Sequence, residues 1–234
     1  MELTELYSQL SFGELSNLAL SNNGNGTIVE EKKPQIVGYA NEALLRLYTR
    51  FVLKQNDLIL EMRPNTTFYH LLSRYAEQSW DSSSEIPYPY IRDLVREKFT
   101  EDVLRVISVY DNNGNERPLD DRERYDSIFV PQANTIQNPL PKIGEYLNVM
   151  YQAKHPKLDA ENVTTIELPD VLHEAFKAYI AYKITGGMNT NEMLAVSQGH
   201  FQMYENICQE LIDRDILGQT QTSTNVKFRK RGWK

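Results

Sequence analysis

The sequence has little of what marks secreted or membrane proteins. Among its 234 residues there is one cysteine, Cys208, so no internal disulfide can form, which fits a reducing compartment. No run of about 18 apolar residues is present, and we therefore expect no membrane-spanning helix. The first ten residues, MELTELYSQL, are acidic and amphipathic rather than basic and then apolar, which predicts no secretory signal.

Residues that carry enzyme chemistry are also scattered. Zinc sites usually have paired ligands at short intervals, but the histidines share no such spacing; they are His70, His155, His173 and His200. Cys208 falls on the apolar face of a predicted helix, where a buried thiol acts as a small hydrophobe. Residues 22–26 contain glycine but lack the lysine of a phosphate-binding loop. The sequence thus predicts no metal, no cofactor and no catalytic residue.

Carboxylates lie close together at one place in the sequence, at Asp120, Asp121, Glu123 and Asp126. A two-metal hydrolase needs converging acids, and an enzyme of this kind would lose its activity in Asp121→Ala. Arg122 and Arg124 are interspersed, however, and this pattern favours a solvated loop with ion pairs. We interpret Glu101 and Asp102, which precede a predicted strand, in the same way.

Apolar residues recur at helical spacing in three regions. Residues 3–10 predict a short helix, and a stronger one begins at Lys33 and runs to Phe51. The chain is organised around residues 168–218, which predict two helices joined by a turn at residues 186–187. We expect the first of these helices to be covered on more than one side, because its apolar band is wide.

Sequence signals also predict how this helical hairpin begins and ends. Asp170 is expected to cap the first helix and residues 189–191 the second, which would end at Gly218 in a left-handed conformation. One face of the second helix is predicted to be apolar and carries Leu194, Phe201, Tyr204, Cys208, Leu211 and Ile212.

The centre of the sequence is rich in β-branched residues and predicts short strands at residues 57–63, 103–110, 126–131, 146–153 and 163–168. Residues 111–115, with their Asn-Gly pair, predict a tight hairpin turn. Residues 68–75 are expected to form a helical turn, and the prolines at 131, 139 and 141 are expected to mark loops.

These elements predict an α+β fold, in which helices from both ends of the sequence form a bundle and a small antiparallel β insert lies between them. The expected parts are an N-terminal helical part at residues 1–56, a β-rich insert at 57–169, a helical hairpin at 170–218 that packs on residues 32–54, and an extended arm at 219–234.

The charge of the chain is unevenly spread. The net charge is −7, yet five of the 25 basic residues lie in the last eight positions, which contain no acid. Phe228 and Trp233 are interleaved with these cations, which is typical of a peptide that becomes ordered on docking to a partner. The arm could bind phosphates of a nucleic acid, but we favour an acidic groove on a protein because of its aromatic anchors.

Three groups of residues, taken in order, resemble the head-to-tail adaptors of short-tailed bacteriophages (podoviruses), also called connectors or tail tubular protein A. The first group is residues 41–48, NEALLRLY. The second is DVLRV at 102–106, then DNNG at 111–114 and PLDD at 118–121. The third is LPD at 168–170, AYIAY at 178–182, YE at 204–205 and FRKRGW at 228–233.

The resemblance implies a non-enzymatic structural protein of the virion, assembled in the host cytoplasm. Such adaptors form a ring of twelve copies beneath the portal, extend the DNA channel, and present a platform for the tail nozzle and for tail fibre or sheath proteins. The arm would reach the portal, with Phe228 and Trp233 as anchors and with Arg229, Lys230 and Arg231 facing its carboxylates. DNA would pass the acidic body without specific binding, and no membrane partner is implied.

One further alternative is a nucleic-acid-binding accessory protein that uses the basic arm. It predicts duplex binding with a steep salt dependence, lost when residues 226–234 are deleted.

Overall fold

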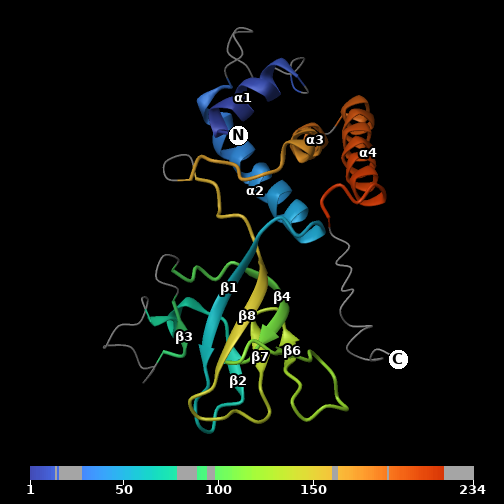
Figure 1. Ribbon diagram of the computed structural model, residues 1–234. Coiled ribbons are helices and arrows are strands. Elements are labelled where there is room, and N and C mark those ends of the chain that lie inside the picture. The colour runs from blue at the N-terminus through green and yellow to red at the C-terminus, as the bar shows by residue number, and fades with distance from the viewer. Residues whose placement is uncertain are drawn as a thin grey trace. The chain divides into compact units, whose positions relative to one another are not determined.

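The computed structural model describes residues 1–13, 15, 28–77, 89–93, 98–159, 163–188 and 190–218. The chain divides into two compact units, which are a helical unit of residues 1–47 with residues from 157 on, and a β-rich unit of residues 48–156 (Figure 1). The predicted α+β class, with helices from both ends of the sequence and an antiparallel insert between them, is confirmed. Within the described residues, no helix is long and apolar enough to cross a membrane. The predicted arm at residues 219–234 lies outside the described residues, as do residues 22–26.

The α-helices are α1 (Leu3–Phe12), α2 (Lys33–Arg50), α3 (His173–Gly186) and α4 (Asn191–Asp213), and short 3-10 helices precede α2 at Glu30–Lys32 and α3 at Asp170–Leu172. Two hydrogen bonds in the helical unit join α2, which precedes the β-rich unit in the sequence, to the segment that follows this unit. The side chain of Asn41 on α2 donates to the carbonyl of Leu158 at 3.1 Å and accepts from the backbone N–H of Leu158 at 2.7 Å. These bonds fix the start of the returning segment on α2.

Helix α3 forms the centre of the helical unit. Its buried residues point in all directions and include Ala175, Phe176, Ala178, Tyr179, Ile180, Ala181, Ile184 and Thr185. The predicted cover on more than one side is therefore confirmed. The prediction of a cap at Asp170 is wrong, because this residue lies inside the 3-10 turn, its side chain is fully exposed, and it makes no capping hydrogen bond.

Helix α4 begins as predicted but ends earlier. The hydroxyl of Thr190 accepts a hydrogen bond from the N–H of Met193 at 3.2 Å, which caps the helix. The helix stops at Asp213 rather than at Gly218, because Asp215 already turns the chain with φ +47°.

The apolar face predicted for α4 is half wrong. The residues that α4 buries are Ser197, Tyr204, Cys208 and Leu211, whereas Leu194 and Ile212 are 46% and 45% exposed. Ser197 is buried because its hydroxyl donates to the carbonyl of Tyr182 on α3 at 3.0 Å. The face of α4 that contacts α3 therefore includes a small polar residue, so apolar character alone does not identify this face.

The β-rich unit holds two antiparallel sheets. The first has the strand order β3-β1-β8-β4-β5 and the second β2-β7-β6. The strands are β1 (Gln55–Glu61), β2 (Phe68–His70), β3 (Ile91–Arg92), β4 (Val103–Tyr110), β5 (Glu116–Arg117), β6 (Phe129–Gln132), β7 (Thr135–Gln137) and β8 (Tyr146–Ala153). Apolar residues of both sheets share one core, among them Leu60, Tyr69, Val109, Ile136 and Val149.

Three predictions in this region need correction. Residues 68–75 are a strand followed by a 3-10 helix at Ser73–Tyr75, because residues 68–70 pair with the distant β7. Pro131 lies in β6 rather than in a loop, and β6 accommodates it as an edge strand whose register shifts between Phe129 and Gln132. Residues 163–168 are no strand, since within the described residues they make only isolated bridges, through Val163 and Thr165.

Candidate docking surface

The turn between β4 and β5 is built on one carboxylate. Oδ1 of Asp111 accepts hydrogen bonds from the N–H groups of Asn113 and Asn115, both at 2.9 Å. The bond from Asn115 is the main reason why the pKa of Asp111 is lowered. Gly114 takes φ +74°, which glycine adopts without strain, so the tight turn predicted here is confirmed. This turn positions β5, which carries Arg117.

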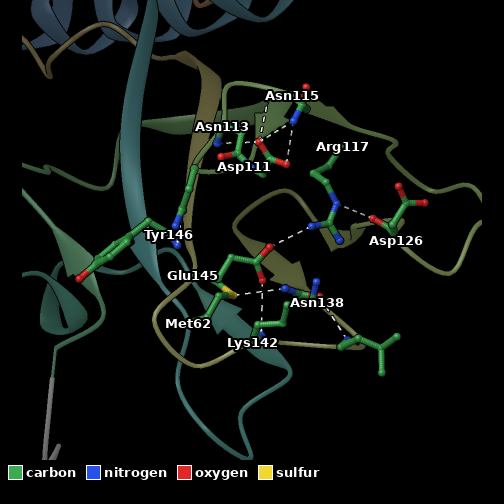
Figure 2. A network of polar contacts seen from close by, with 12 residues as sticks. Met62, Asp111, Asn113, Asn115, Arg117, Asp126, Asn138, Lys142, Glu145 and Tyr146 are labelled. Carbon is green, nitrogen blue, oxygen red and sulfur yellow. Dashed lines mark hydrogen bonds and ion pairs between the residues drawn. The ribbon is translucent and has the colours of Figure 1, made fainter.

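Arg117 joins two loops from different parts of the sequence (Figure 2). Its Nη1 lies 3.0 Å from Oε1 of Glu145, and its Nε donates to the carbonyl of Asp126 at 2.8 Å. The side chains of Arg117 and Glu145 are only 14% and 12% exposed. Removing one member of such a pair leaves the other charge buried alone, so the pair fixes the loop conformation strongly.

The acidic loop at residues 120–127 is ordered by its own polar groups. Arg124 makes two contacts with the carboxylate of Asp126, at 2.7 and 3.0 Å, which also lower the pKa of Asp126. Oδ1 of Asp120 accepts from the N–H of Val130 at 2.9 Å. The predicted loop is thus confirmed, with an ion pair between Arg124 and Asp126. Among the described residues, no group of three or more His, Cys, Asp or Glu side chains is placed to hold a metal ion.

The loop at residues 138–146 is held at both ends. Asn138 is fully buried; its Nδ2 donates to the sulfur of Met62 at 3.3 Å, and its Oδ1 accepts from the N–H of Leu140 at 3.2 Å. At the other end the N–H of Tyr146 donates to Oδ1 of Asn112 at 2.7 Å. This loop is therefore bound to the β4–β5 turn as well as to Arg117.

We call the three segments 111–115, 120–127 and 138–146 the loop cluster. Large apolar side chains point out of it, namely Tyr125, Ile143, Leu140 and Tyr146, which are 85%, 80%, 59% and 40% exposed. The cluster contains six acidic and three basic residues, which disfavours the phosphate backbone of a nucleic acid. Because these exposed apolar residues lie on loops that buried polar groups hold in place, we take the loop cluster as a candidate protein docking surface.

The prediction that Asp102 lies in a solvated loop is wrong. It is 9% exposed and accepts hydrogen bonds from the hydroxyl of Tyr151 at 2.8 Å and from Nδ2 of Asn56 at 3.0 Å. Burial, and then the charge of Asp102, raise the pKa of Tyr151. The cavity beside these residues measures about 20 Å³, enough for a water molecule and far below the roughly 300 Å³ of a small ligand site.

The residues predicted to bind a partner, namely Phe228, Arg229, Lys230, Arg231 and Trp233, lie outside the described residues. The surface that the structure does show is the loop cluster. Only its turn at residues 111–115 and its acidic residues at 120–126 were singled out in the sequence. The buried Cys208 behaves as predicted, as a part of the core.

The loop cluster is a candidate docking surface, and the comparison with known proteins shows to which family the whole chain belongs. No curated protein matches the chain. Residues 11–227 match the SU10 adaptor protein family. This match covers nearly the whole chain and confirms the resemblance to phage adaptors, which are structural proteins of the virion that contact other virion proteins. The chain therefore belongs to the SU10 adaptor protein family.

Proposed function

We propose that the protein is a head-to-tail adaptor of a short-tailed phage, similar to tail tubular protein A, and that it forms a ring of twelve copies between the portal and the tail nozzle. The family match over residues 11–227 carries this proposal. The loop cluster supports it, because a rigid and exposed apolar surface suits a protein whose work is to contact other proteins.

Each part of the chain has a role in this proposal. Residues 1–56 and 170–218 form the wall of the ring, and the β-rich residues 57–169 form the platform for the tail. Residues 219–234 dock onto the portal through Phe228 and Trp233. The genome passes through the channel without specific binding, since the body of the protein is acidic.

The arm is tested by mixing the protein with the portal of the same virus. We expect Phe228→Ala/Trp233→Ala to weaken portal binding by about 100-fold or more, because buried aromatic anchors dominate interface energies. Binding is measured by titration, and copies on the portal are counted by electron microscopy. Gln221→Ala, a neutral change in the same segment, is the matched control and should bind as the unchanged protein does.

The same variants separate this proposal from the alternative that the arm binds nucleic acid. That alternative is favoured by the five basic residues in the last eight positions. It predicts duplex binding that falls steeply with salt, together with portal binding that does not depend on Trp233. This pair of results would contradict the portal proposal.

The loop cluster is tested with the purified tail nozzle protein of the same virus. We expect Tyr125→Ser/Ile143→Ser to lower nozzle binding by at least about tenfold, while the free energy of unfolding changes by only about 0.5 kcal/mol, because both side chains are exposed. Phe12→Ser is the matched control, since Phe12 is 68% exposed but lies on α1. Equal nozzle binding by the cluster variant and the control would contradict a tail-facing role for the cluster.

A further inference from the structure

Side chains of α3 contact both α2 and α4, and we call these three helices of the helical unit (Figure 1) a layer. Glu42 on α2 forms an ion pair with Lys183 on α3 at 2.8 Å. On the α4 side, the rings of Tyr179 and Tyr204 meet edge-on, with centroids 5.3 Å apart. Since α3 has buried residues on every side and exposes only Glu174 near its start, the larger free surfaces of this layer belong to α2 and α4. These two surfaces differ in sequence, so the layer has two unlike outer sides.

Each outer side carries a glycine that the fold does not require. Gly38 lies within α2 and Gly199 within α4, and both are exposed. A Cβ atom built on either residue would meet no heavy atom within 4 Å, and neither residue has a positive φ. Glycine inside a helix makes the helix less stable than alanine would, so Gly38 and Gly199 destabilise α2 and α4. Within the described residues of one copy, no contact and no backbone conformation requires glycine at either position. A close approach by another backbone would account for both.

Each of the two helices also exposes an apolar residue on the side of its glycine or next to that side. Leu45 lies two turns from Gly38 on the same side of α2 and is 50% exposed. On α4, Val196 is 45% exposed and lies three residues before Gly199. Exposed apolar side chains beside a glycine allow a helix from another molecule to pack closely.

The charges of the two sides are complementary. Helix α4 contains four acidic residues and no lysine or arginine, and one of the four, Glu210, forms an ion pair with Arg214 just beyond the helix. On α2, the charge of Glu42 is already paired with Lys183, whereas Arg46, one turn further on, is exposed and lies over the ring of Tyr179 at 5.3 Å. Arg46 lies on the edge of α2 that faces α3, so it would flank a contact between the Gly38 side of α2 and the acidic side of another molecule's α4. Two α4 helices facing each other would instead bring like charges together.

From this we infer that α4 of one copy packs on the outer side of α2 of the next copy, with Gly199 and Gly38 at the contact. The inference rests on the proposed ring and names the surfaces that build it. A contact between two unlike surfaces is heterologous, and repetition of such a contact around an axis closes a ring.

The test uses Gly38→Gln and Gly199→Gln, which each fill one side. In either variant the thermal midpoint of the free protein should stay the same or rise by about 2 °C, because glutamine is the better helix former. On the portal of the same virus, assembly of either variant should require at least tenfold more protein than assembly of the unchanged chain. Glu174→Gln, an exposed change on α3, is the control and should assemble normally.

Mixing the two variants gives the decisive result. Each variant alone should remain monomeric by native mass spectrometry, while an equimolar mixture should form dimers and nothing larger, because only one intact pair of surfaces remains. Dimers formed by Gly38→Gln alone would indicate an α4–α4 contact and would overturn the inference. Normal rings from both variants would also overturn it, whereas failure of the unchanged protein to form rings on its portal would contradict the proposed function itself.

Discussion

Replacing Arg117 with methionine should lower the free energy of unfolding of the β-rich unit by about 3–5 kcal/mol. The physical reason is the position of its partner, because Glu145 is 12% exposed and would remain as a buried charge with no cation beside it. The carbonyl of Asp126 would also lose the hydrogen bond from Nε. Denaturant unfolding followed by circular dichroism measures the change in stability.

Two further variants show whether burial is the cause. Arg124→Met removes a pair of similar geometry with Asp126, but Arg124 is 55% exposed, so the cost should be within about 1 kcal/mol. In Arg117→Met/Glu145→Leu both charges are gone, and most of the stability should be recovered. A cost for Arg117→Met as small as that for Arg124→Met would show that the Arg117–Glu145 pair is not shielded from water.

Replacing Phe176 with alanine should destabilise the helical unit by a similar amount, about 3–5 kcal/mol. Phe176 is fully buried on α3, which is enclosed on all sides, so the surrounding side chains have little room to move into the space that the ring leaves. Thermal and denaturant unfolding measure the change.

The matched control lies on the neighbouring helix. Ile212→Ala removes a side chain that is 45% exposed and should cost less than about 1 kcal/mol. If the two variants were equally destabilised, α3 would not be the centre of the helical core.

Long, regular segments could be predicted from the sequence. The predicted bounds of strands β4 and β8 agree with the observed ones, because each has eight residues with the β-branched and alternating pattern of a half-buried strand. Helix α2 could be predicted for a similar reason, since its apolar stripe repeats over eighteen residues. The tight turn at residues 111–115 followed from local chemistry alone.

Short and non-local features could not be predicted in this way. Strands β2 and β7 have three residues each, too few to show a period, and they form only because distant segments pair. The contact between Arg117 and Glu145 joins residues 28 positions apart, and no local pattern marks it. The burial of Asp102 could not be predicted either, because its partners, Tyr151 and Asn56, are 49 and 46 positions away.

The two hydrogen bonds between Asn41 and Leu158 have a consequence for the history of this protein. They hold the departing and the returning chain together on the helical side of the junction with residues 48–156. Genetic recombination between these two points would exchange the intervening segment as one piece while the two hydrogen bonds remained. Under the proposed function, such an exchange would replace the platform for the tail and leave the helices of the ring wall unchanged.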